Sequence, residues 1–467
     1  MGERDRFEEM VTVDERGIDR RRVLKTGAAV AGIAAASRIG LAGAQVASPA
    51  ASPAASDLPI TGFIGDDVTV SGPVEIEYWQ YELETKTDLV GELIKEFQAA
   101  NPNITVKQVN FPYDDFRQQV AAAVQAGEGP DVLNVFYGWI PAYVQQQFLV
   151  PLPAEYFPAD QIEKDYFPMV QVAKVKDAYY ALPTAVRTLA LLYNKDILEA
   201  AGQQPPTTWE ETVAVAQATV KKDGENFEIV GITQDIGGQG HSWWREGLIR
   251  QNGALPFKDE TQNRELNWTS AEAVEAFAWL TGLLTEQKVT QTGFQTDGPT
   301  AFGSGKAALH VDGSYRIGSL KASNPELNYG VVPLPAHKDK ASFASFWANT
   351  ITRNAAEGDK LIASAKFIDF LSSPSVQQRW TPAIGELPAR VSLASDPALM
   401  QDEKLAPFIE SLAWSYATFT VNEADLRQAV MDAFDQVTLN GVDVESALTE
   451  AQDKIQAQYD EYWAAMG

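Results

Sequence analysis

The sequence contains no cysteine and only three histidines, His241, His310 and His337. Without cysteine the chain has no disulfide, thiolate nucleophile, cysteine zinc site or cysteine-linked lipid anchor. With so few histidines, a histidine-built metal centre or catalytic triad is not expected. Nothing in the sequence requires a cofactor, and we expect none.

Positive charge is also scarce. The chain has 37 Lys and Arg against 63 Asp and Glu, a formal net charge of −26. Because phosphates are bound by basic surfaces, nucleic acid is excluded as an expected partner. The acidic excess favours solubility and does not define the charge of a ligand.

The 467 residues are 45% hydrophobic and 10% aromatic. That composition is typical of a globular protein and excludes a disordered chain. The length exceeds what a single hydrophobic core serves well, so we expect two or more globular units.

The N-terminal segment indicates export. Arg20-Arg21-Arg22-Val23-Leu24-Lys25 fits the twin-arginine pattern, and a small, apolar run follows from Gly27 to Ala36. This run is about half of the ~20 residues needed to cross a bilayer. With Ala42-Gly43-Ala44 as a cleavage site, residues 1–44 are predicted to be a twin-arginine signal peptide. The protein would then be in the periplasm or on the outer cell surface. A signal retained as an anchor and a short amphipathic helix are the alternatives.

Residues 47–56 repeat a five-residue unit rich in Ala, Ser and Pro. Proline at every fifth position keeps the backbone extended, and the side chains cannot form a core. We therefore predict a spacer over residues 45–72.

Strand and helix signals alternate from Pro73 onward. Strands are expected at 74–79, 104–109 and 132–136, with helices at 89–97 and 116–124, the second closed by Gly127. This order predicts an α/β fold with a mostly parallel sheet flanked by helices. Capping boxes at Thr208–Glu211 and Thr269–Glu272 predict two further helix starts. The spacing of apolar residues over 448–463 predicts a long terminal helix.

Ligands of such sheets bind outside the carboxyl ends of the strands. That rule directs attention to Trp79-Gln80-Tyr81, after the first strand, and to Tyr137-Gly138-Trp139, after the third.

Four segments carry a resemblance to a known family: Gly129-Pro130-Asp131-Val132; Tyr180–Arg187 running into Leu192–Leu198 and Pro206–Trp209; Ala301–Leu309 running into Asp312–Tyr315; and Leu387-Pro388-Ala389-Arg390. In this order and spacing they resemble the family-1, sugar-binding class of extracellular solute-binding proteins, the maltose-binding-protein-like receptors of ABC importers. The resemblance covers the chain from about Pro73 to the C-terminus.

The resemblance implies two α/β lobes with the ligand held in the cleft between them. Lobe 1 would comprise residues 73–183 and 310–348, and lobe 2 residues 184–309 and 349–467, joined by hinge strands. Hinge closure would report ligand binding to the permease subunits of the importer. A monomer without enzymatic activity is expected.

A sugar presents an apolar face and a rim of hydroxyls. Aromatic rings cover the face, while carboxylates, amides and guanidiniums bind the rim. The aromatic candidates near expected strand ends and loops are Trp79, Tyr81, Tyr137, Trp139, Trp243, Trp244, Tyr315, Trp347 and Trp414. Core packing is the alternative for each. Trp243 is favoured over its neighbour as the contact, and Tyr315 is favoured because the resemblance places an aromatic ring there.

The polar candidates are Gln80, Asp312, Arg187 and Asn349, with Glu82, Glu386 and Arg390 as rim groups. Asp312 ends an apolar run, and capping of the Gly313 turn is its alternative role. Arg187 stands where relatives place an acidic residue, which favours a ligand with an acidic group; a salt bridge is its alternative role. Asn349 could donate to one hydroxyl and accept from another.

These features predict a receptor for a carbohydrate or related polyol, a mono- or oligosaccharide. A secreted carbohydrate-active enzyme and a receptor for an acidic solute such as a glycerophosphate are the alternatives. An enzyme would need two placed carboxylates, and no pair stands out among many.

Overall fold

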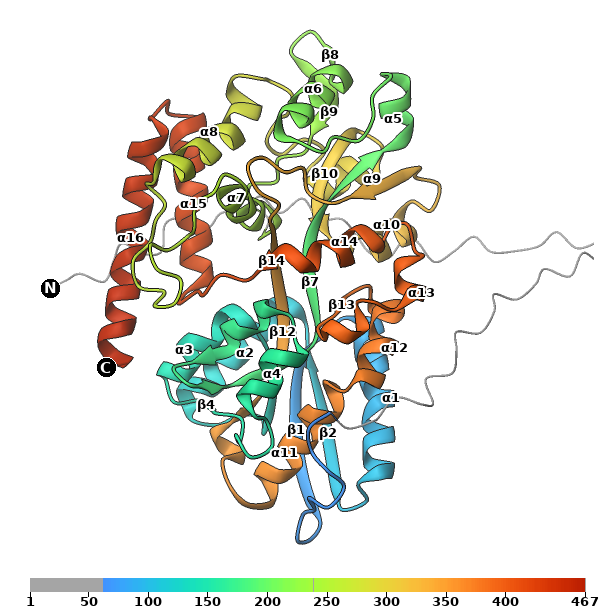
Figure 1. The fold of residues 1–467 in the computed structure, drawn as a ribbon, viewed down its shortest axis with the longest axis vertical. Helices are drawn as coiled ribbons and strands as arrows, with labels where there is room; N and C mark the ends of the chain where they lie inside the picture. The colour runs from blue at the N-terminus through green and yellow to red at the C-terminus, as the bar shows by residue number, and fades with distance from the viewer. Residues whose placement is uncertain (1–61, 238, 467) are drawn as a thin grey trace, which may run out of the picture. The chain divides into compact units, whose positions relative to one another are not determined.

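The computed structural model describes residues 62–237 and 239–466 (Figure 1). The twin-arginine segment and residues 45–61 of the predicted spacer lie outside the described residues.

The first five expected elements are present: β1 (Val74–Tyr81), α1 (Glu84–Ala100), β2 (Ile104–Phe111), α2 (Tyr113–Ala126) and β3 (Val132–Phe136). β1 pairs in parallel with β2 and with β3, which confirms the predicted parallel arrangement. Gly127 ends α2 with a φ of 71°, a left-handed conformation that glycine adopts at little cost. The predicted cap at Thr208 is confirmed, but α8 (Ala271–Thr285) is capped by Ser270 rather than Thr269.

Two long strands connect the sheet. β7 (Ala181–Asn194) and β12 (Ser342–Thr352) pair with each other in antiparallel fashion, β12 also pairs with β3, and β7 also pairs with β10 (Ala307–Gly313). With β8 at Lys221–Asp223 and β9 at Asn226–Ile232, the strand order is β2-β1-β3-β12-β7-β10-β9-β8. In Figure 1 these two strands run between a lower and an upper group of elements. Nearly every side chain of both strands is buried, as expected of central strands.

The elements around β1–β3 form lobe 1, and those around β8–β10 form lobe 2. The remaining elements of lobe 1 are α3 (Ile140–Gln145), β4 (Leu149–Val150), α4 (Ala159–Asp165), β5 (Lys174–Val175), β6 (Ala178–Tyr179), α11 (Gly358–Leu371), α12 (Pro374–Ile384) and β13 (Leu387–Pro388). Those of lobe 2 are α5 (Lys195–Ala200), α6 (Trp209–Thr219), β8 (Lys221–Asp223), β9 (Asn226–Ile232), α7 (Gln239–Gln251), α8, α9 (Gly298–Gly303), α10 (Arg316–Ser323), β11 (Tyr329–Val332), α15 (Glu423–Thr438) and α16 (Val444–Met466). α13 (Pro397–Met400), α14 (Ala406–Ser411) and β14 (Ser415–Tyr416) lie on the return path, and 3-10 turns occur at 137–139, 168–173, 353–355, 391–393 and 412–414.

These contacts give lobe boundaries that differ from the expected ones. β10 pairs with β9, so residues from His310 to Val332 belong to lobe 2 rather than lobe 1. α11 and α12 pack on β1 and α1, so residues 358–384 belong to lobe 1. The reason is that the chain crosses from lobe 2 back to lobe 1 along β12. It then leaves lobe 1 again only after β13.

Residues 62–72, predicted to be spacer, instead form part of the folded body. Ile64 and Val70 are buried, and the backbone N–H groups of Gly62, Phe63 and Ile64 donate to the carboxylate of Asp369 on α11. We call residues 62–72 the strap. The Ala, Ser and Pro repeat ends before this stretch. Residues 62–72 carry apolar side chains that can pack into the core.

Among the described helices, none is long and apolar enough to cross a bilayer.

Candidate functional site

A pocket of about 190 Å³ lies in lobe 2 where β10 ends. Its walls come from β9, α7, α9, β10 and α10 and consist of Thr233, Asp235, Gly240, His241, Trp244, Pro299, His310, Val311, Asp312, Tyr315 and Arg316. This volume is roughly ten times the ~10–15 Å³ that a cavity needs to hold one water, so a ring-sized group can enter it.

Asp312 accepts several of the hydrogen bonds in this pocket. Its carboxylate accepts hydrogen bonds from Arg316 Nε at 2.5 Å, from His310 Nε2 at 3.1 Å and from the backbone N–H of Gly313 at 2.7 Å. Burial and the nearby Asp312 carboxylate together raise the pKa of Tyr315. Burial would raise the pKa of Asp312, but His310 and Arg316 together lower it well below its usual range. Because a carboxylate only accepts, His310 Nε2 carries a proton. Asp312 is therefore a fixed anion that orients Arg316 and lies close to Tyr315.

Asp235, just after β9, is a second carboxylate of the pocket, and the described residues give it no hydrogen-bond or ion-pair partner. Burial raises its pKa, and the neighbouring charge of Asp297 raises it further. Such a carboxylate can accept hydrogen bonds from a ligand. The sequence reasoning missed Asp235, because neither an aromatic neighbour nor a motif marks it; its only signal is its place after a strand.

His241 and Trp244 face this pocket from the first turns of α7. His241 Nε2 lies 2.6 Å from the side-chain oxygen of Gln234, and burial lowers the pKa of His241 to about 3, so the ring is neutral. Trp244, and not Trp243, lines the pocket. Trp243 instead stacks between Phe343 and Phe136, with ring centroids 5.6 and 6.4 Å away. Adjacent helical residues point about 100° apart, and the register of α7 decides which ring faces the pocket.

Arg187 lies on β7 between the lobes and contacts both of them. Its Nε donates to Glu386 at 2.6 Å and its Nη2 to the Tyr81 hydroxyl at 2.9 Å, while its guanidinium carbon lies 5.3 Å from the centre of the Tyr315 ring. Trp380 Nε1 donates to the other oxygen of Glu386 at 2.8 Å. Burial would raise the pKa of Glu386, but the charges of Arg187 and Lys86 lower it. The salt bridge considered as the alternative role of Arg187 is thus present.

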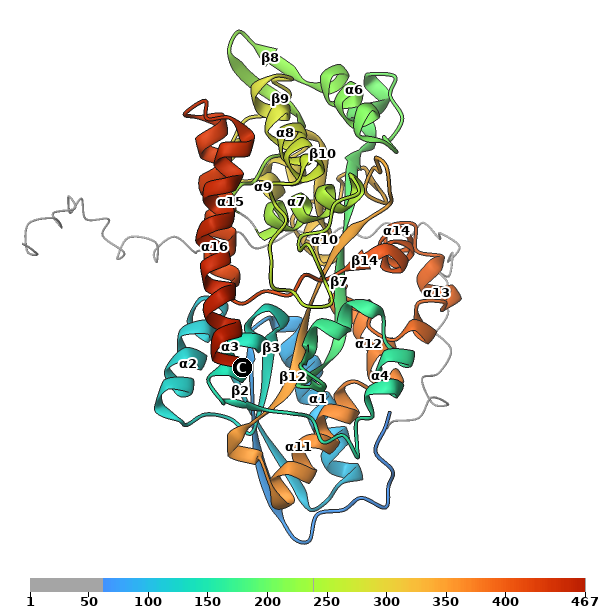
Figure 2. The same cartoon turned by 60° about the vertical axis from the view of Figure 1, so that its left-hand side comes forward.

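Aromatic rings continue from Tyr81 across lobe 1. The Tyr81 ring lies 4.4 Å from Trp347, and Trp347 lies 5.4 Å from Trp139. Trp139 borders a groove of about 520 Å³ whose walls come from both lobes: Arg117, Ala121, Gly138, Trp139, Ala142, Tyr143 and Gln145 on one side, and Val421, Asn422, Glu423, Asp425, Gln458, Glu461 and Tyr462 on the other. Figure 2 shows the end of α16 beside α3 at this place. A chain of contacts from Trp139 to Tyr315 therefore links the groove with the pocket.

Beneath Tyr81, a buried polar network crosses the sheet. Lys86 Nζ donates to Asn134 Oδ1 at 2.7 Å and lies 3.8 Å from the centre of the Tyr81 ring. Asn349 accepts from Asn134 and from the Tyr78 hydroxyl and donates to Thr184. Asn349 is 1% exposed, so its side chain is not accessible to a ligand in this arrangement, contrary to the prediction. Its amide instead forms hydrogen bonds between strands.

The other predicted candidates lie apart from the pocket and its aromatic chain. Trp79 bonds to Glu77 and packs on Phe111, Gln80 is fully buried against Asn110, and Tyr137 packs on Phe346. Trp414 lies under Lys340. Glu82 is exposed, and Arg390 pairs with Asp165. Trp79 lies on the same face of β1 as Tyr81 but further from the end of the strand.

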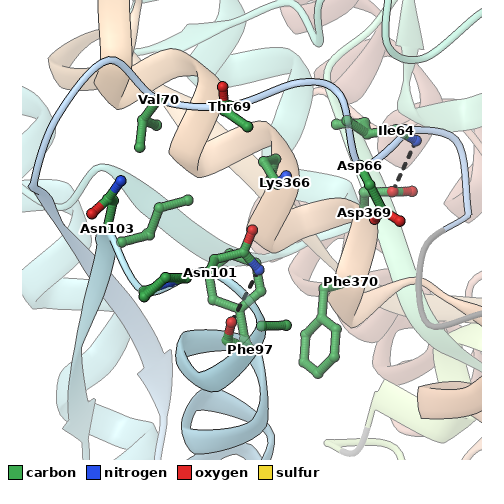
Figure 3. Close-up of a pocket in the computed structure, with 13 residues that line it drawn as sticks. Ile64, Asp66, Thr69, Val70, Phe97, Asn101, Asn103, Lys366, Asp369 and Phe370 are labelled. Carbon is green, nitrogen blue, oxygen red and sulfur yellow. Dashed lines mark hydrogen bonds between the residues drawn. The ribbon is translucent and has the colours of Figure 1, made fainter.

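A hollow of about 590 Å³ lies elsewhere in lobe 1, beneath the strap and against the end of α1, the start of β2 and α11 (Figure 3). Phe97, Ile104 and Phe370 give it an apolar floor. None of the predicted site residues lines it. Volume alone therefore does not identify the functional site.

The described residues contain no group of three or more His, Asp or Glu side chains arranged to hold a metal ion.

The comparisons with known proteins agree with this architecture. Residues 92–407 match the family model described as bacterial extracellular solute-binding protein. The chain belongs to this family.

Among relatives, a maltotriose-binding protein of Pyrococcus abyssi is 25% identical over 350 residues, which cover 74% of this chain and 73% of that protein. Two solved structures have the same fold. The sugar-binding protein MalE of Xanthomonas citri gives a TM-score of 0.72 at 25% identity, covering 83% of this solute-binding protein and 98% of the other. A cyclic alpha-maltosyl-1,6-maltose binding protein of Arthrobacter globiformis gives 0.72 at 21% identity, covering 84% and 100%. The two-lobed α/β fold is thereby confirmed.

Proposed function

We propose that this solute-binding protein is the receptor of an ABC importer and binds a carbohydrate, without hydrolysing it, between its lobes. The observation that carries the proposal is the combination around Tyr315 of an aromatic ring, the partly buried carboxylate of Asp235 and the ion pair of Asp312 with Arg316. A ring and several charged hydrogen-bonding groups match the apolar face and the hydroxyl rim of a sugar. The ligands in the names of the relatives, maltotriose among them, support the same class.

The proposed ligand contacts are Trp244, Asp235, Asp312, Tyr315 and Arg316 in lobe 2. From lobe 1 and the crossing strands, Tyr81, Trp139 and Trp347 supply aromatic surface. We propose that the lobes, with β7 and β12 as hinge strands, close on the ligand, so that ligand binding is converted into a shape that the permease can read.

The receptor is proposed to be a monomer that reaches the periplasm or the outer cell surface through the twin-arginine signal at residues 1–44. If that signal is removed, the receptor diffuses freely; if it is retained as an anchor, the receptor stays attached to the membrane.

A thermal-shift screen tests the proposal. Because a ligand that binds only the native state stabilises it, a selective rise in melting temperature with neutral saccharides is expected. Chromatography of each stabilising saccharide should recover it unchanged. Turnover of the saccharide would contradict a receptor, and stabilisation by a glycerophosphate alone would contradict a carbohydrate ligand.

A further inference from the structure

Arg187 contacts one tyrosine from each lobe. Tyr81 ends β1 in lobe 1 and accepts a hydrogen bond from Arg187 Nη2, while Tyr315 follows β10 in lobe 2 and lies beside the same guanidinium. Arg187 itself is on β7, one of the two strands that cross between the lobes. A single side chain therefore spans the junction.

The position of Arg187 is fixed from a third direction. β13 pairs with β7 through Leu387 and Val186, which places Glu386 next to Arg187. The side chains of Arg187 and Glu386 are only 17% and 8% exposed. Charged hydrogen bonds at such low exposure are stronger and more directional than those at a surface.

The turn before β13 also touches lobe 2. Gly385 has a φ of 82°, and a Cβ built on it would lie 3.6 Å from the backbone oxygen of Ser314 and 3.8 Å from the Cα of Tyr315. The segment that carries Glu386 thus packs on the turn that carries Tyr315, and the two lobes meet at this point.

We infer that Arg187 is a positioning residue that holds the lobes together before ligand binds, by clasping Tyr81 and Tyr315 while Glu386 neutralises its charge. The clasp preassembles the aromatic surface of the proposed site. Since the guanidinium is already paired, it contributes no selectivity for acidic ligands. Only the affinity part of this inference rests on the proposed function.

The test measures the distance between the lobes in the absence of ligand. The chain has no cysteine, so Glu92→Cys on α1 and Lys222→Cys on β8, both exposed, accept a pair of dyes for energy transfer. In this labelled protein, Arg187→Met should lower the transfer efficiency of the ligand-free form. Arg379→Met removes an arginine that pairs with Glu96 on the surface of lobe 1 and should leave the efficiency unchanged. An unchanged efficiency with Arg187→Met would overturn the inference.

Affinity supplies the second readout. If the competent, closed population falls, the apparent dissociation constant rises by the same factor, and saturating saccharide should restore the transfer efficiency. We expect at least a fivefold rise for Arg187→Met, equal for neutral and acidic saccharides. A larger loss for acidic ones would overturn the inference in favour of charge recognition.

Tyr81→Phe provides a milder variant if Arg187→Met does not fold. It removes one hydroxyl and keeps the ring, and it should lower the ligand-free transfer efficiency in the same direction. An unchanged efficiency would overturn the clasp. Failure of every saccharide to bind would instead contradict the proposed function and leave the ligand-free measurement valid.

Discussion

The guanidinium of Arg187 is paired with the carboxylate of Glu386, although 199 residues separate them in the sequence. The pair lies beside the two tyrosines that come from opposite lobes. An arginine whose charge would suit an acidic ligand thus has that charge satisfied within the protein.

Tyr315→Ala should weaken saccharide binding more than tenfold, or about 1.4 kcal/mol and more, because it removes an aromatic ring that lines the lobe 2 pocket. Titration calorimetry measures this. Tyr315→Phe keeps the ring and should lose less. Trp414→Ala, outside the site, serves as the control. An unchanged affinity of Tyr315→Ala would remove Tyr315 from the site.

Asp235→Asn should reduce affinity and flatten its pH dependence. Burial and Asp297 raise the pKa of Asp235, so acidification protonates this acceptor before an ordinary aspartate. Binding by the unaltered protein should therefore weaken as the pH falls through that raised value. Calorimetry across the acidic range compares the two proteins, and identical pH profiles would show that Asp235 does not contact the ligand.

The two adjacent tryptophans should respond differently to conservative change. Trp244→Phe should lower affinity because Trp244 lines the pocket, whereas Trp243→Phe should lower the melting temperature more than the affinity because its ring stacks between Phe136 and Phe343. Calorimetry and thermal unfolding of both variants provide the comparison. The reverse pattern would favour Trp243 as the ligand contact.

Lys86 should make the stability of the protein depend on pH near neutrality. Burial lowers its pKa to about 7 in the folded state, against the ordinary lysine value of 10.5. Above about pH 7 the unfolded chain keeps a proton that the folded protein releases, so the free energy of unfolding should rise with pH until the ordinary lysine pKa of 10.5 is reached.

Lys86→Met removes the ionisable group and should remove that part of the slope, as measured by urea unfolding at several pH values. Lys95→Met, at an exposed position on α1, should keep the slope. Equal slopes for Lys86→Met and the unaltered protein would contradict this account of the lysine.

The strap should stabilise lobe 1. Asp369→Ala leaves three backbone N–H groups of the strap without their acceptor, and an unsatisfied buried group costs roughly 1–3 kcal/mol. Denaturant unfolding should show this loss, while saccharide affinity should be unaffected because the strap is remote from the lobe 2 pocket. Stability equal to that of the unaltered protein would show that the strap contributes nothing.

Sequence patterns located the parallel strands of lobe 1 because apolar periodicity and the Asn-Pro and Gly breaks mark each element. They also indicated Tyr81, Trp139, Asp312 and Tyr315, which the structure connects through Arg187 and Trp347. These residues lie at or just after strand ends, and the ends of neighbouring strands converge in any fold of this class.

What the sequence could not provide was the direction of individual side chains and the partners they meet. Asn349 points into the polar network between β3, β7 and β12, and Trp243 points at Phe136. Both outcomes depend on strand or helix register. The lobe boundary was misplaced for a related reason, because pairing between β10 and β9 is a long-range contact with no local signal.

The most direct test of the central claim is titration calorimetry of the purified protein with maltotriose and a panel of other neutral saccharides, set against glycerophosphate and sugar acids. The account predicts that at least one neutral saccharide binds with micromolar or tighter affinity, that Tyr315→Ala weakens it more than tenfold, and that the saccharide is recovered intact. Binding restricted to the acidic solutes, or hydrolysis of the bound saccharide, would contradict it.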